Sequence, residues 1–322
     1  MSLVFRALFN ALAQGGARSR LSTLIFHRVL PQPDPLFPDE ITRERFDELC
    51  GWLKAWFQVL PLSDAAALLR QGTLPRGALS ITFDDGYADN HDVALPVLQR
   101  HGLNATFFVA TGFLDGGRMW NDTLIEAVRA SRLSTLDLRG LHPQVSALPM
   151  ENVQAKTLAI GRLVKYAKYM PVEERIQFVD AVAHRAEASL PGNLMMSTPQ
   201  VRQLRAAGMH IGAHTVTHPI LRSLPRPAAR HEIEASKQHL ERLLGEPVSL
   251  FAYPNGKFGE DYSPESVELA REAGFAAAVS TQWGVSTQRT DPFQLRRFTP
   301  WDRQGWRFGL RLAGNLARSS DS

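Results

Sequence analysis

The side chains best suited to chemistry in this chain include two adjacent carboxylates. Asp84 and Asp85 follow the run 81–83, whose residues suit a buried strand, and Gly86 comes next. Successive strand residues point to opposite faces, so the two carboxylates cannot do the same job from the same direction. We expect two roles. An ordinary polar turn after a core strand is the alternative that these residues alone leave open.

The second chemical pair is His214 and His218, which stand four residues apart after another predicted strand at 209–213. Two imidazoles and one carboxylate suit a catalytic divalent metal, because they leave positions open for water and substrate. An H-x-x-x-H pair by itself is weak evidence, since on a helix it is often an ordinary surface pair. Joined by a carboxylate from Asp84 or Asp85, the pattern predicts a metal site.

A scaffold that gathers strand ends must position these residues, and the chain repeats the unit of such a scaffold. Three predicted helices each stop at a glycine and lead into an apolar strand, at 105–110, 209–213 and 275–279. Helix, glycine and strand in series indicate parallel strands with crossover helices. We therefore predict an α/β fold, a (β/α) barrel that need not have all eight regular units.

In a parallel barrel the carboxyl ends of the strands share one face, and active sites are built there. The residues just past each predicted strand are therefore expected on that face: His27, Asp84 with Asp85, Thr111, His214 with His218, 253–255, and Thr281 with Trp283. Because this set contains both the carboxylates and the histidines, we expect them to converge.

The repeating pattern stops between about residues 115 and 195, where the chain is polar and helix-like. We interpret this stretch as a helical insertion on a barrel that spans 21–300, and not as a separate domain. It can shape a substrate groove, or it can be a solvated helical pair that stabilises the barrel. The segment 1–20 is expected to be a surface helix, and 301–322 a C-terminal tail.

Composition narrows the classes of partner. The chain has 322 residues, of which 44% are apolar and 21% charged, so it can bury a full core. Its single cysteine, Cys50, has no partner for an internal bridge. The net charge is +4 and the pI about 9.4, but the arginines are scattered and are not interleaved with aromatic residues. We therefore expect no nucleic-acid partner.

The two ends of the chain bear on membrane contact. No window reaches the roughly 18 uninterrupted apolar residues of a membrane span. Arg6 and Asn10 interrupt what would be the hydrophobic region of a signal peptide, which argues against secretion. The segment 305–318 mixes apolar residues with arginines, so it can touch an anionic membrane or pack on its own domain as a helix. We expect a cytoplasmic protein, at the inner membrane surface if that contact forms.

Three motifs, in this order, resemble the polysaccharide deacetylases, the carbohydrate esterases with the chitooligosaccharide deacetylase homology domain. They are T-F-D-D-G at 82–86, H-T-V-T-H at 214–218 and F-A-Y-P-N-G at 251–256. F-H-R-V at 26–29 and D-P-F-Q-L-R-R-F at 291–298 are similar to the bacterial exopolysaccharide branch, so the resemblance covers about 21–298. It implies a distorted (β/α) barrel and removal of N-acetyl or O-acetyl groups from sugars. It also implies a divalent metal, usually zinc, with cobalt, nickel or manganese as alternatives.

Carried over by position, the resemblance implies that Asp84 is the general base and that Asp85, His214 and His218 bind the metal. A metal lowers the pKa of its bound water from about 15.7 to about 7. Asp84, beside the metal but not bound to it, can take the proton of that water. The family places a backbone N–H for the developing oxyanion in the third motif, here near Asn255.

Substrate contacts are expected around the third motif and at two tryptophans. Pro254 stiffens the loop that carries Asn255, and Tyr253 can either pack or contact sugar. Trp283, which follows a strand end, and Trp120, in the insertion, can line a sugar groove because aromatic faces pack on pyranose rings. A core role is the alternative for each tryptophan.

The chain departs from the family pattern at three places. Ala252 stands where many members carry an arginine that orients the base, Asn255 replaces the usual aromatic residue, and the late L-R-R motif lacks the histidine that serves as general acid. We predict that His27, at the end of the first strand, supplies an acid or a substrate contact, with a core or capping histidine as the alternative. Arg296 and Arg297 can face solvent or pair with a site carboxylate.

The function expected from these observations is metal-dependent deacetylation of an N-acetylated sugar in a polysaccharide or its lipid-linked precursor. One alternative is hydrolysis of a smaller amide or imide on the same fold. Another is a degenerate barrel that binds glycan without cleaving it, which the missing histidine and arginine suggest. The retained cluster of carboxylates and histidines argues against that last alternative, because a pure binding protein does not need it.

Overall fold

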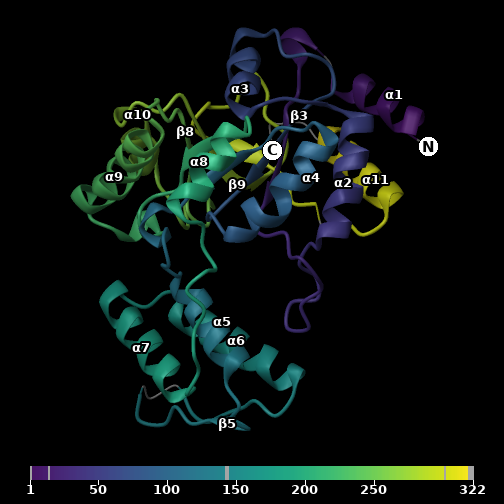
Figure 1. The fold of residues 1–322 in the computed structure, drawn as a ribbon. Coiled ribbons are helices and arrows are strands. Elements are labelled where there is room, and N and C mark those ends of the chain that lie inside the picture. The colour runs from purple at the N-terminus through teal and green to yellow at the C-terminus, as the bar shows by residue number, and fades with distance from the viewer. Residues whose placement is uncertain (1, 14, 142–144, 301, 318–322) are drawn as a thin grey trace. The chain divides into compact units, whose positions relative to one another are not determined.

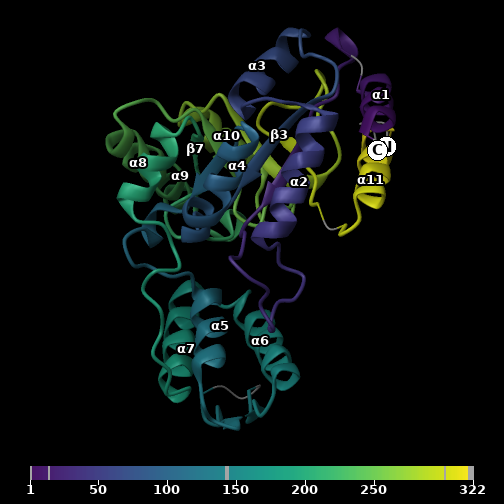
Figure 2. The ribbon, with the colours of Figure 1, turned by 45° about the vertical axis from the view of Figure 1, so that its right-hand side comes forward.

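The computed structural model describes residues 2–13, 15–141, 145–300 and 302–317, which form two compact units (Figures 1 and 2). The first unit comprises Met1–Pro31, Ile41–Asp115 and Met196–Ser322, and the second comprises Gln32–Glu40 and Gly116–Met195. Each has a hydrophobic core of its own. The first unit contains all the strand ends at which chemistry was expected.

A parallel sheet forms the centre of the first unit. Its strands follow the order β1-β3-β4-β7-β8-β9-β10, and β2 pairs with the first residues of β3. The strands are β1 (Ser22–Phe26), β2 (Gln58–Val59), β3 (Ala78–Phe83), β4 (Thr106–Val109), β7 (His210–Ala213), β8 (Leu250–Ala252), β9 (Ala277–Trp283) and β10 (Leu295–Arg297).

The two end strands of this order, β1 and β10, meet and bring the sheet close to a full circle. Leu24 forms a parallel bridge with Phe298, directly after β10. The amide of Ile25 donates to the Phe298 carbonyl at 3.1 Å, and the Phe298 amide donates to the Thr23 carbonyl at 2.7 Å. The predicted distorted (β/α) barrel is confirmed, with seven strands of the described chain along this circle and the short β2 paired to β3 off it.

The strands read as near-continuous apolar runs because both of their faces are covered. Every side chain of β1 and β3 is buried. The rings of Phe26 and Phe83 stack with centroids 5.2 Å apart, and those of Phe83 and Phe107 stack at 4.7 Å. Phe46 packs edge-on against Phe83. This filled interior holds the carboxyl ends of β1, β3 and β4 in fixed positions.

Helices cover the outside of the barrel, and they begin and end at recognisable caps. Ser197 and Ser263 each form a capping box, and Gly102 and Gly245 close helices in the left-handed conformation. None of the helices in the described ranges has the length and apolar character needed to cross a membrane. The helices of this unit are α1 (Ser2–Leu12), α2 (Arg43–Trp56), α3 (Leu62–Gln71), α4 (Leu95–His101), α8 (Thr198–Ala206), α9 (Arg226–Leu244), α10 (Pro264–Glu272) and α11 (Gly305–Ala317).

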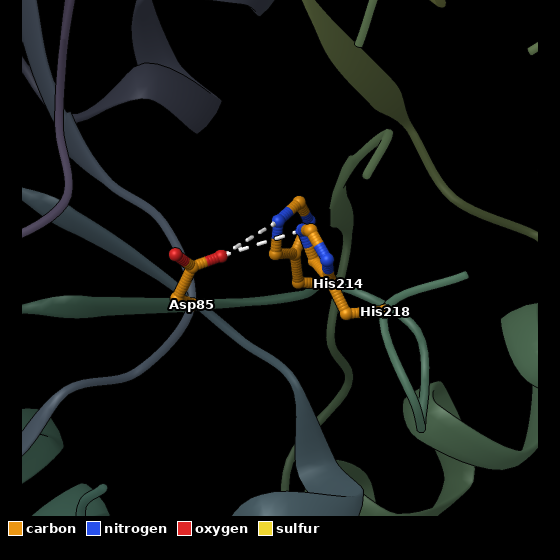
Figure 3. A group of neighbouring side chains, drawn as sticks. All are labelled: Asp85, His214 and His218. Atoms are coloured by element: carbon orange, nitrogen blue, oxygen red, sulfur yellow. Dashed lines mark ion pairs between the residues drawn. The ribbon is translucent and has the colours of Figure 1, made fainter. Parts of the chain in front are cut away.

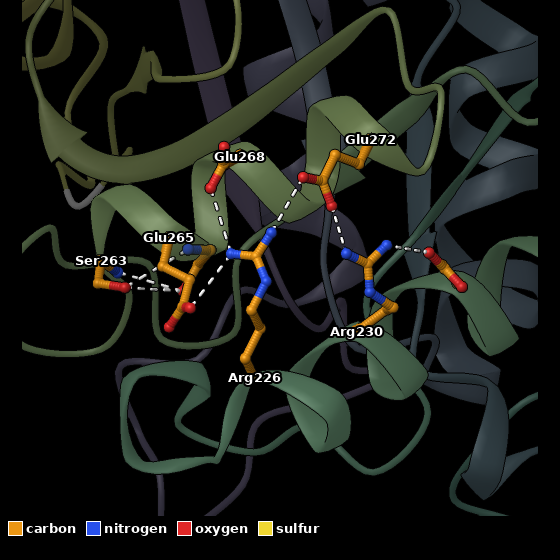
Figure 4. A network of polar contacts seen from close by, with 8 residues as sticks. Arg226, Arg230, Ser263, Glu265, Glu268 and Glu272 are labelled. Carbon is orange, nitrogen blue, oxygen red and sulfur yellow. Dashed lines mark hydrogen bonds and ion pairs between the residues drawn. The ribbon is translucent and has the colours of Figure 1, made fainter.

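A surface network of charges joins α9 to α10 (Figure 4). Arg226 on α9 contacts Glu265 at 3.1 Å, Glu268 at 3.2 Å and Glu272 at 2.9 Å, and Arg230 pairs with Glu272 as well. All these side chains are at least one-third exposed, so solvent screens the attraction and each pair contributes little to stability. The network fixes how the two helices lie beside each other.

The second unit is helical. It contains α5 (Trp120–Ala130), α6 (Val153–Ala167), α7 (Val172–Arg185) and a small antiparallel pair of β5 (Thr135–Leu136) with β6 (Leu148–Pro149). The proline-rich segment Gln32–Glu40 also belongs to it, because Asp34 forms a two-pronged ion pair with Arg129 at 2.7 and 2.9 Å. No sequence pattern had joined this segment to the helices.

Candidate metal centre

The end of β3 delivers two carboxylates to the same face of the barrel and turns them toward different partners. The Asp84 amide still donates to the Phe26 carbonyl of β1 at 2.9 Å, so Asp84 continues the strand. At Asp85 the backbone switches to a left-handed conformation with φ of 75°. A non-glycine residue held there is strained, and such strain is concentrated at functional sites. The turn therefore directs the Asp84 and Asp85 side chains toward different partners.

The histidine pair faces Asp85 (Figure 3). The Nε2 atoms of His214 and His218 each lie 3.4 Å from Asp85 Oδ1. His214 follows β7, and its Nδ1 lies 2.7 Å from the Ala252 carbonyl. A carbonyl can only accept, so Nδ1 carries a proton, and Nε2 is the nitrogen that faces Asp85. Once any proton on Nε2 is displaced, this leaves the tautomer that a metal-binding histidine needs.

The loop between the two histidines is held in an unusual shape. Thr215 and His218 have positive φ angles of 65° and 53°. The Thr215 hydroxyl donates to the His214 carbonyl and accepts from the His218 amide. Glu232 on α9 accepts from the amides of Val216 and Thr217, each at 2.8 Å. These contacts keep both imidazoles aimed at Asp85 without contribution from a ligand.

A close backbone contact supports the same loop from the other side. The Gly112 amide donates to the Val216 carbonyl at 2.8 Å. A Cβ atom at residue 112 would lie 2.7 Å from that carbonyl oxygen, so only glycine fits. Neither Gly112 nor Glu232 was singled out from the sequence, because each acts on the loop and carries no chemistry itself.

A divalent metal ion fits the Asp85, His214 and His218 donor set. One ligand atom from each residue lies within 4.8 Å of the others. Asp85 Oδ1 is buried and has no hydrogen-bond partner within the described part of the chain. A buried carboxylate oxygen without a donor is costly in a protein interior, and a bound cation would satisfy it. Three protein ligands also leave positions open for water and substrate.

The charges of the cluster suit metal binding. Burial opposes ionisation of Asp85, but His214, His218 and His27 outweigh it and hold the Asp85 pKa well below its usual range. Burial lowers the pKa of His218 to about 4, so this imidazole is neutral at pH 7. Burial also acts to lower the pKa of His214, but contact with Asp85 and the charge of Asp84 raise it overall. A metal must therefore displace a proton chiefly from His214.

Asp84 is fully paired with a buried arginine from β10. Arg297 donates to the two Asp84 oxygens at 2.6 and 2.7 Å, and it also donates to the Ser280 carbonyl at 2.8 Å. The exposed fractions of the Arg297 and Asp84 side chains are 0% and 3%. Burial alone would raise the Asp84 pKa, but Arg297 and His214 lower it overall, so the carboxylate stays charged.

Arg297 therefore contacts Asp84 in this chain, where many family members have an arginine at the position of Ala252. Of the two readings left open for Arg297, pairing with a site carboxylate is the one observed. The strand pattern held a signal for this: in β10, Leu295 and Arg297 share one side and are buried, while Arg296 between them is only half-buried. An arginine at an inward strand position requires a buried carboxylate partner.

His27 directly follows β1, so it stands at the end of the barrel that carries Asp84 and Asp85. Its charge is a minor contribution to the lowered pKa of both carboxylates. The His27 side chain is exposed, and the backbone carbonyl of His27 accepts from the side-chain amide nitrogen of the buried Asn90 at 2.8 Å. Asp89 fixes the next residues by accepting from the Val29 amide. The catalytic role of His27 stays a prediction.

The third motif is mostly structural. Tyr253 is 0% exposed and its ring stacks on Tyr262 with centroids 4.0 Å apart, so of the two alternatives for this residue packing is the one observed. Pro254 is buried as well, so its side chain cannot line a sugar groove and can only stiffen the loop. Asn255 is exposed with φ of 57°, and its backbone N–H has no partner in the described ranges. That N–H is available to a ligand.

The two tryptophans belong to different units. Trp283 at the end of β9 is 42% exposed and stacks on Phe298 with centroids 5.1 Å apart, so one ring face is supported by the barrel. Trp120 begins α5 of the second unit, where its half-buried ring packs against that unit's core under the Arg175 guanidinium. A sugar contact of either residue stays a prediction.

Comparison with known proteins gives a family and a fold. The family model described as "Polysaccharide deacetylase" matches residues 71–136 and 140–278, which together span more than half of the chain. "Putative polysaccharide deacetylase YxkH" of Bacillus subtilis (strain 168) is 20% identical over 281 residues, which cover 87% of this chain and 71% of that protein.

Solved structures agree with the barrel described above. IcaB from Ammonifex degensii has a TM-score of 0.59 and 19% identity, with 95% of this chain and 99% of that chain covered. Streptococcus pyogenes deacetylase PplD, solved in complex with acetate, has a TM-score of 0.58 and 17% identity, with 87% and 92% covered. A de-N-acetylase from Aggregatibacter actinomycetemcomitans has a TM-score of 0.53 and 16% identity, with 87% and 94% covered. These proteins share the fold of this chain.

Proposed function

Since the chain belongs to the polysaccharide deacetylase family, we propose that it is a metal-dependent hydrolase that removes N-acetyl, or O-acetyl, groups from sugar residues of a polysaccharide or its precursor. The observation that carries the metal dependence is the buried Asp85 oxygen, which faces two imidazole nitrogens and has no hydrogen-bond donor within the described part of the chain. Zinc suits the donor set, and cobalt, nickel and manganese are alternatives.

Each residue of the site has a role in this proposal. Asp85, His214 and His218 hold the metal, which when bound acts as a Lewis acid that activates water and polarises the acetyl carbonyl. Asp84 accepts the proton of the attacking water, and Arg297 keeps that carboxylate charged and pointing in one direction.

The remaining steps concern the charge and proton of the substrate. The attack forms a C–O bond and places negative charge on the carbonyl oxygen, toward which the Asn255 N–H donates. Breaking the C–N bond then releases acetate and leaves an amine that must gain a proton. His27, at the same end of the barrel, supplies that proton, in place of the histidine absent from the late motif.

The central experiment measures bound metal and acetate release on the same preparations. The substrates are N-acetylglucosamine oligomers, and the proteins are the wild type, Asp84→Asn and Asp92→Asn. Asp92 is a matched control, since it is an exposed carboxylate of the same segment. We expect Asp84→Asn to keep its metal and to lose about 10²- to 10⁴-fold in kcat, as general-base removal does.

Other results of this experiment would favour the other functions. Metal without acetate from any glycan would point to hydrolysis of a smaller amide or to glycan binding alone. Absence of metal in protein that was prepared without chelators would refute the proposed catalysis. A loss in Asp92→Asn equal to that in Asp84→Asn would show that the assay does not report on the site.

The role of His27 has a test of its own. A protonated leaving group is needed for an amine but not for nitrophenolate, so His27→Ala should lose about 10²-fold or more on an N-acetyl oligomer and little on 4-nitrophenyl acetate. His91→Ala, a half-buried histidine paired with Asp92, serves as the control. Full activity of His27→Ala on the oligomer would remove His27 from the mechanism.

A further inference from the structure

Two helices from opposite ends of the sequence lie side by side on the barrel unit (Figures 1 and 2). The inner face of α1 buries Phe5 and Phe9, and the inner face of α11 buries Phe308 and Leu312. A Cβ atom at Gly309 would lie 2.5 Å from the Phe5 ring, so the helices approach as closely as a glycine permits. We call the exposed side chains of these two packed helices their outer surface.

That outer surface carries much of the exposed apolar area of the barrel unit. Among its described residues, four of the six large apolar side chains that are exposed belong to these two helices. They are Leu3, Val4, Trp306 and Leu310, exposed to 80%, 71%, 47% and 55%. Side chains of this size are not left exposed together without a reason, and such clusters mark sites that contact a partner or a membrane.

The pattern within each helix is that of an interfacial helix. Trp306 and Leu310 are four residues apart, so they share one outward stripe of α11. On α1, the exposed Ala7 continues the stripe begun by Leu3 and Val4. A tryptophan at the edge of an apolar stripe, with arginines beside it, suits the boundary between lipid headgroups and acyl chains.

The charge on this surface has one sign. Neither α1 nor α11 contains an acidic residue, whereas Arg6, Arg307 and Arg311 are all exposed on them. Arg311 pairs with Asp302, but Arg6 and Arg307 make no ion pair with residues in the described ranges. Cationic side chains bordering an apolar stripe are complementary to anionic lipid and would repel a second copy of the same surface.

The helices of the second unit also expose apolar side chains, and they differ from α1 and α11 in charge. Leu158 on α6 and Ile176 on α7 are also exposed, to 66% and 52%. However, Glu173 and Glu174 stand in the first turn of α7, so the charges there are mixed. The exposed apolar residues of the second unit therefore have charges of both signs near them, whereas the helices α1 and α11 carry only positive charges.

We propose that the outer faces of α1 and α11 together bind the surface of an anionic phospholipid bilayer, with both helices lying in the plane of the membrane. Leu3, Val4, Trp306 and Leu310 enter the headgroup boundary, and Arg6 and Arg307 contact lipid phosphates. This contact would hold the barrel at a membrane surface. It is independent of the proposed catalysis, because none of these residues belongs to the metal centre.

The test is sedimentation of the full chain with vesicles. Phosphatidylcholine vesicles that contain phosphatidylglycerol should bind the protein, and pure phosphatidylcholine vesicles should bind it at least about tenfold more weakly. Added salt should reduce binding to the anionic vesicles because it screens the arginines. Val4→Glu combined with Leu310→Glu should lower the partition coefficient about tenfold or more. Both positions are more than half exposed, so the variant should fold.

Leu158→Glu is the matched control, an equally exposed leucine on α6, and it should bind vesicles like the wild type. Deacetylation of a soluble oligosaccharide and the thermal midpoint should be unchanged in all variants. Equal binding to neutral and anionic vesicles, or unchanged binding of the Val4 and Leu310 variant, would overturn the proposal. So would a dimer that this variant abolishes in the absence of any vesicle binding, since the surface would then join two copies.

Discussion

The two halves of the candidate site treat their buried carboxylates in opposite ways. Both oxygens of Asp84 receive hydrogen bonds from Arg297, so this charge is satisfied by the protein alone. Asp85 Oδ1, one residue further, faces only two imidazoles at 3.4 Å and has no donor in the described chain. Because Arg297 already satisfies the charge of Asp84, this carboxylate does not need a cation and can accept a proton from water. The Asp85 oxygen lacks a donor within the described residues, so a bound cation would stabilise it. This difference supports the proposed assignment of Asp84 as the general base and Asp85 as a metal ligand.

The largest expected effect comes from removing a metal ligand. His214→Ala should abolish stoichiometric metal binding and lower kcat/KM by about 10³-fold or more, because metal contributes several kcal/mol to the reaction. Metal analysis after desalting, together with acetate release, measures both.

The matched control is His210→Ala on the same strand. His210 is half-buried and its Nδ1 lies 3.4 Å from the Ser63 hydroxyl, away from the cluster. It should keep both metal and activity. If His214→Ala retained its metal, the Asp85 side would not be the metal site and the contrast with Asp84 would fail.

The next largest effect is expected from breaking the pair of Asp84 and Arg297. Arg297→Met leaves a buried charge on Asp84 without its partner, which should cost about 3 to 5 kcal/mol of unfolding free energy. It should also raise the Asp84 pKa, since the group that outweighs burial is gone. The base must be ionised, so the acidic limb of the activity profile should move to higher pH. Urea unfolding and a pH–rate profile measure these two results.

Two further variants sharpen that result. Arg296→Ala changes the neighbouring half-buried arginine, which alternates with Arg297 along β10 and so points to the opposite side of the strand, and it should leave the pH–rate profile unchanged. Arg297→Met combined with Asp84→Asn should recover much of the lost stability, because the buried charge disappears. Independent, additive losses would mean that the pair is not coupled as its geometry implies.

A smaller effect is expected from the loop anchor on α9. Glu232→Ala removes the acceptor for the amides of Val216 and Thr217, which shape the loop that carries both histidines. Residues that orient metal ligands typically contribute about 10- to 100-fold to metal affinity, and the lower figure is expected here because the contact is to the loop and not to an imidazole. Competition with a chromogenic chelator gives the affinity.

Glu234→Ala is the control on the same helix, since among the described residues Glu234 forms an ion pair only with Arg230, at 3.0 Å. It should leave the metal affinity unchanged. A loss in Glu234→Ala as large as that in Glu232→Ala would indicate a general loosening of α9.

The sequence was informative where chemistry depends on residue type and short spacing. Periodic helix, glycine and strand units predicted the barrel, and Asp84, Asp85, His214 and His218 could be assembled because parallel strands end on one face. What could not be predicted depended on contacts across long separations. Arg297 and Asp84 are 213 residues apart in the sequence. Glu232 binds the amides of a loop that lies 15 and 16 residues before it. The sequence left open whether Tyr253 packs or contacts sugar, because a strand end can turn a ring inward as easily as outward.

The smallest expected effect is a change in how metal affinity depends on pH when the charge of Asp84 is removed. His214 has a raised pKa because contact with Asp85 and the charge of Asp84 outweigh burial. Metal must displace that proton, so affinity should fall by about tenfold for each pH unit below the His214 pKa. His218, with a pKa of about 4, adds no further loss above that pH. Asp84→Asn removes one of the charges that hold the proton on His214.

The affinity of Asp84→Asn should therefore begin to fall at lower pH than that of the wild type, although the intact ligand set gives both proteins the same affinity at alkaline pH. Calorimetric titration with zinc across a pH series measures this difference, with Asp92→Asn as the control that should follow the wild type. An unchanged pH dependence in Asp84→Asn would mean that Arg297 neutralises Asp84 so completely that its charge does not reach His214. The pair of Asp84 and Arg297 would then be electrostatically independent of the metal centre, and Asp84 would influence catalysis through proton transfer alone.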